Sequence, residues 1–246
     1  SQTGPSLTAG QLAGMLDTLA REARLPEMIY FSDNDPAGHP RLDAFIEVAR
    51  EKGVSQIALQ CDVLRIAQDD RFLTSLARLK PMVFLEFDGF DETASLILHG
   101  RRDLPFETRR ALDRLATAGL PAALLTSVAR GINLQEVVAI AAFGLKHPAV
   151  FSAIFRPFPP ENNRLWDAPA TVVTAASIME ALERQSQGFF NRDCFSPALC
   201  CRPDRHFVAQ VPVGHQAPGG AGPSGHAGSL PCPAPLVGSR SNGHSS

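Results

Sequence analysis

Short apolar runs alternate along this chain with longer segments whose apolar residues recur at helical spacing. In the first such segment, Leu12, Met15, Leu16 and Leu19 stand at positions i, i+3, i+4 and i+7. This spacing places them on one face of an amphipathic helix. The next apolar run is only five residues long and ends in a stretch of Asp, Asn and Pro, which is typical of a buried strand followed by a loop.

The same unit then repeats along most of the chain. The spacing predicts strands at 27–31, 56–60, 82–87, 122–127 and 150–155. It predicts helices at 8–22, 41–53, 69–79, 107–118, 134–145 and 169–184. Regular alternation of strands and helices requires a parallel sheet with crossover helices, so we expect an α/β fold. Five such strands fit either a doubly wound sheet or part of a barrel.

Polar side chains stand where the predicted strands end. They are Ser32 to Asp35, Gln60 and Asp62, Glu86 and Asp88, Thr126 and Arg130, and Arg156. Functional groups gather at the carboxyl ends of strands in barrels and open sheets alike, so we expect the site there. Glu86 and Asp88 share one face of their strand because they are two residues apart. Buried carboxylates need a cationic partner, and Arg130 and Arg156 are the candidates, for internal pairing or for ligand contact.

The composition changes near residue 206. From Pro212 to Ser246 the chain has six Pro and eight Gly, no Asp or Glu, and a single Arg. Such a stretch buries too little apolar surface to offset the entropy of ordering it. We therefore expect a folded core with a Cys-containing extension over residues 1–206 and a disordered tail over residues 207–246.

Charge and cysteine content exclude several classes of protein. The formal net charge of −2 provides no field that would attract nucleic acid. No apolar run approaches the roughly 18 residues of a membrane-spanning helix, so we expect no transmembrane segment. The five cysteines are an odd number, and four lie in the last quarter of the chain, unlike a secreted disulfide framework. We therefore expect a cytoplasmic protein.

Five stretches along the chain form an ordered set of motifs. They are MIYFSDNDPAGHP at 28–40, LEFDGF at 85–90, GRRDL at 100–104, VARGIN at 128–133 and FSPALCCRP at 195–203. In this order they resemble motifs of the radical S-adenosylmethionine (SAM) superfamily, and in particular of a subgroup that includes the archaeal tetraether lipid synthases and a related pterin-methylating enzyme. The first stretch resembles the family's strand and Gly-Gly-Glu-Pro loop, and the last stretch resembles the subgroup's C-terminal cysteine motif. The resemblance covers about residues 5–206.

This resemblance implies a partial (β/α)6 TIM-like barrel that lacks its first strand, with SAM and a [4Fe-4S] cluster as cofactors. In that family a Cys-x3-Cys-x2-Cys loop binds the cluster, and an electron donor drives cleavage of SAM to a 5′-deoxyadenosyl radical. The implied substrate is a lipid-like or heterocyclic small molecule. No such cysteine triad occurs in the chain. Ser1 stands where an initiator Met is expected, and we expect the cluster loop upstream of it.

The resemblance also implies which residues bind the cofactor. The implied SAM-binding residues are Asp33, Asn34, Asp35, Asp62, Glu86, Asp88 and Arg130. The first three stand where the family has Gly-Gly-Glu, so two glycines have become side chains and Glu has lost a methylene. Asp and Asn tolerate the left-handed backbone that such glycines adopt, yet they add volume and charge beside the ligand. The alternative is a polar loop that caps the following helix.

The C-terminal motif implies weak binding of an auxiliary cluster by Cys194, Cys200 and Cys201. Arg205 stands where the subgroup has its last cysteine, and a tetrahedral set needs four donors. The alternative interpretation is three reduced thiols near the end of the folded region.

Three functions follow from these observations. The first is a radical SAM enzyme, present here as a fragment or a degenerate member that is not competent alone. The second is an inactive barrel that serves as a binding or partner scaffold. The third is a divalent-metal enzyme, because the carboxylates at the strand ends could hold Mg²⁺ or Mn²⁺.

Overall fold

The computed structural model describes residues 7–23, 25–32, 39–158, 173–197 and 207–208. Its main sheet has five parallel strands in the order β1-β2-β3-β4-β5. They are β1 Met28–Phe31, β2 Gln56–Gln60, β3 Met82–Glu86, β4 Ala122–Val128 and β5 Val150–Pro157. Helices separate consecutive strands, which confirms the predicted α/β fold with a parallel sheet.

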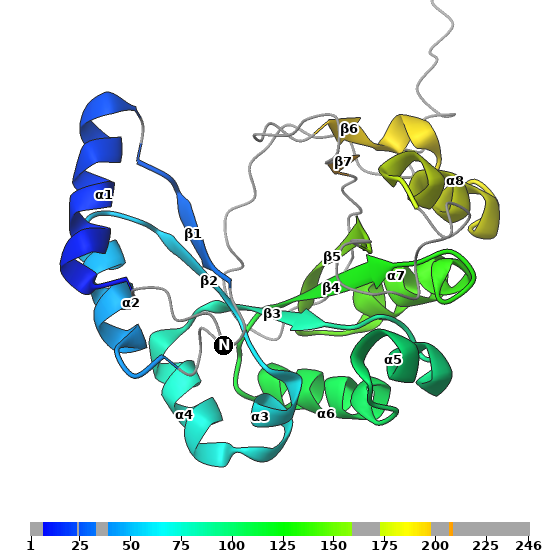
Figure 1. Cartoon of the computed structure of the whole chain (residues 1–246), viewed down its shortest axis with the longest axis horizontal. Helices are drawn as coiled ribbons and strands as arrows, with labels where there is room; N and C mark the ends of the chain where they lie inside the picture. The colour runs from blue at the N-terminus through cyan, green and yellow to red at the C-terminus, as the bar shows by residue number, and fades with distance from the viewer. Residues whose placement is uncertain (1–6, 24, 33–38, 159–172, 198–206, 209–246) are drawn as a thin grey trace, which may run out of the picture.

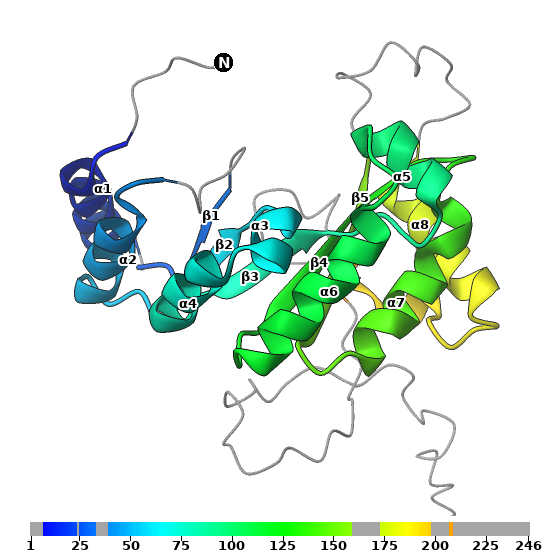
Figure 2. The same cartoon turned by 90° about the horizontal axis from the view of Figure 1, so that it is seen from below.

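Consecutive strands are neighbours in the sheet, with Tyr30 opposite Ala58 and Glu86 opposite Leu125. A doubly wound sheet reverses its strand order at a switch point, and this sheet does not. Because parallel crossovers have one hand, a sequential order keeps the crossover helices on one face of the sheet. Figures 1 and 2 show the helices on the outer face of a curved sheet, as in part of a barrel. We call the opposite face of the sheet the concave face.

The helices between the strands begin at polar caps. They are α1 Ala9–Glu22, α2 Leu42–Glu51, α3 Val63–Gln68, α4 Asp70–Leu79, α5 Glu92–His99, α6 Leu104–Thr117 and α7 Val137–Lys146, the last preceded by the 3-10 turn Leu134–Glu136. Thr8 and Gln11 form a capping box on α1, and Asp69 caps α4. After β5, helix α8 Ala175–Gln185 begins at the Thr174 cap and contacts α7 and β5.

Two helices were missed by the sequence pattern, namely α3 and α5. They have six and eight residues, too few turns for a clear apolar period. Their caps were the available signal, because Asp62 accepts the Arg65 N–H and Asp91 accepts the N–H of Thr93. The last helix was predicted from residue 169, and residues 169–172 lie outside the described part of the chain.

The apolar core lies between the sheet and its helices. Leu59, Leu85 and Leu124 are fully buried on the outer face and pack with helix residues such as Ile66 and Leu112. Alternate strand residues point the other way, and Ala58, Phe84, Ala123 and Leu125 form a small second cluster on the concave face. The core therefore fixes which residues of each strand reach the concave face.

The C-terminal end of the described chain contains a short antiparallel pair, β6 Ser196–Pro197 and β7 Phe207–Val208. Strand β7 consists of Phe207 and Val208, the first two residues of the segment predicted as a disordered tail. Residues 209–246 lie outside the described residues. Within the described ranges, none of the helices has the length and apolar character needed to cross a bilayer.

Candidate functional site

Each of the five strands contributes one polar side chain to a row near the carboxyl end of the concave face. The row consists of Tyr30, Gln60, Glu86, Ser127 and Arg156, from β1 to β5 in order. The register staggers the row by two residues from strand to strand between β1 and β4, so that Glu86 is opposite the residue two before Ser127, while Ser127 is directly opposite Arg156. We refer to these five residues as the polar row.

Hydrogen bonds join the polar row from one end to the other. The Tyr30 hydroxyl donates to Gln60 Oε1 at 2.9 Å, and Gln60 Nε2 lies 3.5 Å from Glu86 Oε1. Arg156 donates to the same Glu86 oxygen at 3.2 Å and to Ser127 Oγ at 3.0 Å. Burial raises the pKa of Tyr30, so its phenol remains a proton donor at neutral pH.

Glu86 is at the centre of this row and faces solvent. Its side chain is 39% exposed and that of Arg156 is 45% exposed. An ion pair this exposed contributes little to folding stability. Both groups therefore remain accessible to a ligand that offers hydrogen-bond donors or acceptors.

Aromatic side chains line the concave face beside the polar row. The rings of Tyr30 and Phe84 are 4.8 Å apart, and those of Phe84 and Phe151 are 6.3 Å apart. Met28, Tyr30, Phe151 and Ile154 are all exposed on this face. Large apolar side chains grouped on one concave face are typical of a surface that binds a ligand or another chain.

A histidine and an aspartate form a close pair at the end of β3. Asp88 Oδ2 and His99 Nε2 are 2.5 Å apart, and the Asp88 side chain is only 4% exposed. The other Asp88 oxygen accepts the Ser127 N–H at 2.6 Å. The hydrogen bond that Asp88 accepts raises the pKa of His99; burial opposes this, and the charges of Asp88 and Glu86 reinforce it.

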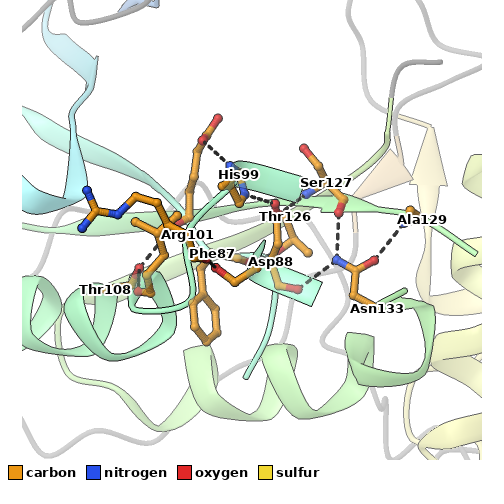
Figure 3. Close-up of polar contacts among 12 residues, drawn as sticks. Phe87, Asp88, His99, Arg101, Thr108, Thr126, Ser127, Ala129 and Asn133 are labelled. Carbon is orange, nitrogen blue, oxygen red and sulfur yellow. Dashed lines mark hydrogen bonds and ion pairs between the residues drawn. The ribbon is translucent and has the colours of Figure 1, made fainter. Parts of the chain in front are cut away.

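Buried hydrogen bonds fix the backbone around this pair (Figure 3). Asn133, which is fully buried, donates to the carbonyls of Asp88 and Ser127 at 2.8 and 2.9 Å. Its Oδ1 accepts the Ala129 N–H at 2.8 Å. One side chain thus ties the loop after β3 to the end of β4. The Thr126 hydroxyl, donating to the Phe87 carbonyl at 2.8 Å, adds a second tie.

The structure brings some predicted site residues together and separates others. Glu86 and Asp88 are close, and Arg156 pairs with Glu86 as predicted. The cation beside Asp88 is His99, whereas Arg130 is exposed and appears in none of the described contacts of the two carboxylates. Asp62 caps α3.

Other predicted residues cannot be placed. Asp33, Asn34, Asp35, Cys200 and Cys201 lie outside the described residues. Cys194 ends the 3-10 turn Arg192–Cys194, and its side chain is also outside the description. Their predicted roles therefore stay predictions.

The sequence reasoning missed His99 altogether. The available signal was the buried Asp88 that needed a partner, together with the Asp91 cap that starts a helix ending at His99. It also left Tyr30 and Ser127 without a role, although the period of two places each on the concave face.

Comparisons with known proteins agree with this geometry. No family model matches the chain. The chain is 22% identical over 199 residues to 7,8-dihydro-6-hydroxymethylpterin dimethyltransferase from Methanocaldococcus jannaschii. The match covers 77% of this chain and 38% of that protein, so the chain spans well under half of its relative.

A solved structure shares the fold. The polyhistidine-tagged protein anSMEcpe with bound AdoMet aligns over 77% of this chain and 51% of that one, with a TM-score of 0.51 and 16% identity. At this level of identity, the likeness to anSMEcpe concerns the fold of the chain. A domain of pyruvate-formate lyase-activating enzyme from Bacteroides vulgatus aligns over 65% of this chain and 92% of that domain, with a TM-score of 0.46 and 15% identity.

The described residues of this chain do not offer the ligands of an iron–sulfur cluster. These residues contain no group of three His, Cys, Asp or Glu side chains that could hold a metal ion. The predicted divalent-metal site also includes Asp33 and Asp35, which lie outside the described residues, so it stays a prediction. Cys61, the cysteine described in full, is a buried thiol at 5% exposure.

The side chains on the concave face do fit SAM. An exposed carboxylate accepts hydrogen bonds from hydroxyl and ammonium groups, and an aromatic surface packs against a purine. Glu86 supplies the first feature, and the exposed rings of Tyr30 and Phe151 supply the second.

Proposed function

We propose that this chain is the SAM-binding portion of a radical SAM protein, with the ligand seated on the concave face. The observation that carries the proposal is the polar row, in which an exposed Glu86 shares the concave face with the exposed rings of Tyr30 and Phe151. In this arrangement Glu86 accepts the ribose hydroxyls or the amine of SAM. Arg156 and Gln60 hold the Glu86 carboxylate in place from either side.

The family's chemistry is reductive cleavage of SAM at a [4Fe-4S] cluster, supplied with an electron by a donor. The described residues offer no cluster ligands, and the sequence has no Cys-x3-Cys-x2-Cys loop. We therefore propose a fragment or degenerate member that lacks the first barrel strand and binds SAM without cleaving it alone. The binding role of Asp33, Asn34 and Asp35 belongs to the same proposal.

The substrate belongs to this proposal as well. The relative from Methanocaldococcus jannaschii is named for a pterin, which is a flat heterocycle. The exposed rings of Tyr30 and Phe151, which both pack against the buried Phe84, give the concave face an aromatic surface for an apolar or heterocyclic small molecule. The cysteine usage supports action in a reducing, cytoplasmic compartment.

Titration calorimetry with SAM tests the binding proposal. We expect binding in the micromolar range and an affinity roughly tenfold lower for E86Q, which removes the charge and keeps the shape. E92Q is the matched control, because Glu92 is an exposed carboxylate in the first turn of α5. Equal affinities for E86Q and the wild type would place the ligand elsewhere.

A second measurement tests the lack of cleavage. After anaerobic treatment with iron, sulfide and dithionite, we expect the chain to release no 5′-deoxyadenosine from SAM. Release by this chain alone would contradict the proposed fragment or degenerate state.

A further inference from the structure

His99 lies between two carboxylates of different exposure. Its Nε2 is 2.5 Å from Asp88 Oδ2, and its Nδ1 is 3.8 Å from Glu86 Oε2. Asp88 is buried and also accepts the Ser127 N–H, so it has a fixed place in the fold. Glu86 is 39% exposed on the concave face. The imidazole therefore links the interior of the fold to the surface proposed to bind the ligand.

Charges alternate across this part of the site when His99 is protonated. Asp88 and Glu86 are negative, His99 is positive, and Arg156 is positive on the far side of Glu86. The other side chains that line the small cavity beside His99 do not titrate: they are Phe87, Ser95, Leu104, Pro105 and Thr108. Loss of the His99 proton therefore changes the net charge of these four groups from zero to −1.

The position of His99 makes it a competitor of any ligand at Glu86. A protonated imidazole donates from Nε2 to Asp88, and its Nδ1 lies 3.8 Å from an oxygen of the carboxylate that a ligand would use. We propose that a cationic or hydrogen-bond-donating ligand at Glu86 drives the proton off His99 and into solvent. This proposal rests on ligand binding at the concave face, as proposed above, and adds its control by pH.

The sign of the effect follows from linkage. A ligand that occupies Glu86 weakens the attraction that keeps His99 protonated, so the deprotonated form binds the ligand better. Affinity for a cationic ligand should therefore rise as the pH rises through the pKa of His99, and then level off. Two charges 3.8 Å apart near a protein surface predict a change of about fivefold.

Titration calorimetry in two buffers of different ionisation enthalpy measures proton release directly. SAM and S-adenosylhomocysteine share the ribose hydroxyls and the amine that Glu86 is proposed to accept, so both serve as probes. We expect each to release protons on binding at pH 7, and SAM to bind up to about fivefold more tightly at pH 7.5 than at pH 6, a range in which its own amine stays largely protonated. SAM binding to the wild type without proton release at pH 7 would overturn the proposal.

Two variants test whether the proton released on ligand binding comes from His99. H99Q keeps an amide donor for Asp88 but cannot titrate, so its proton release should vanish and its affinity should be flat with pH. H147Q is the control, because His147 lies 3.3 Å from Asp113 on the outer helices. Proton release that persists in H99Q, or disappears in H147Q, would refute the assignment.

A measurement without ligand separates this proposal from the proposed function. The pKa of His99 is read from the NMR shift of its imidazole protons in the wild type and in E86Q. We expect a lower pKa in E86Q, and an unchanged value would show that Glu86 and His99 are not coupled. No binding of SAM at any pH, combined with a lower His99 pKa in E86Q, would instead contradict the proposed function alone.

Discussion

Replacing Asn133 by alanine should strongly destabilise the fold, because this side chain joins two strand ends. Asn133 is 0% exposed and makes three buried hydrogen bonds, to the carbonyls of Asp88 and Ser127 and from the Ala129 N–H. Truncation leaves three backbone groups buried without these partners. At about 1 to 1.5 kcal/mol each, N133A should lower the free energy of unfolding by about 3 to 5 kcal/mol.

A second variant checks that hydrogen bonding, rather than volume, is the cause. N133D keeps the acceptor for Ala129 but places a carboxylate against the carbonyls of Asp88 and Ser127. It should be at least as destabilised as N133A at pH 7 and should recover as the carboxyl is protonated at low pH. If acidification does not raise the stability of N133D relative to that of N133A, this reasoning is contradicted.

Urea denaturation followed by circular dichroism gives these free energies. Q135A is the matched control, because Gln135 is an exposed amide two residues away that donates to the Ile132 carbonyl. Its effect should stay within about 0.5 kcal/mol. A loss for N133A within about 1 kcal/mol of the loss for Q135A would refute the proposed role of Asn133.

Two further predictions concern the same region of the fold. In G89A, the new Cβ would lie 1.9 Å from Glu136 Oε2 at a φ of +124°, so the free energy of unfolding should fall by about 2 to 4 kcal/mol. G119A, with positive φ and open space, should cost only about 1 kcal/mol, and similar losses in urea denaturation would disprove the clash. Because the pKa of His99 is raised, its stabilising effect is complete below the unfolded-state value of about 6.5 and lost as the pH rises through the folded-state value. The difference in unfolding free energy between wild type and H99Q should therefore shrink from pH 6 to pH 9, and a constant difference would rule out this contribution.

The fold class could be predicted because it depends on local patterns. The apolar spacing of α1 and the short runs of β2 and β3 are properties of neighbouring residues, and the structure has these elements at almost the predicted places. Short capped helices such as α5 were not predicted, because eight residues show too little periodicity to indicate a helix.

The sequence by itself determined that the strands are parallel, that helices separate them and that Glu86 and Asp88 share one end of the sheet. Only the tertiary structure decided which residues pair with these two carboxylates. The strand order 1-2-3-4-5 brings Arg156 to Glu86 across 70 residues, while the loop after β3 brings His99 to Asp88. Local spacing predicts the face on which a residue lies. The choice of partner depends on sheet register and loop path, which are set by the packing of the whole core.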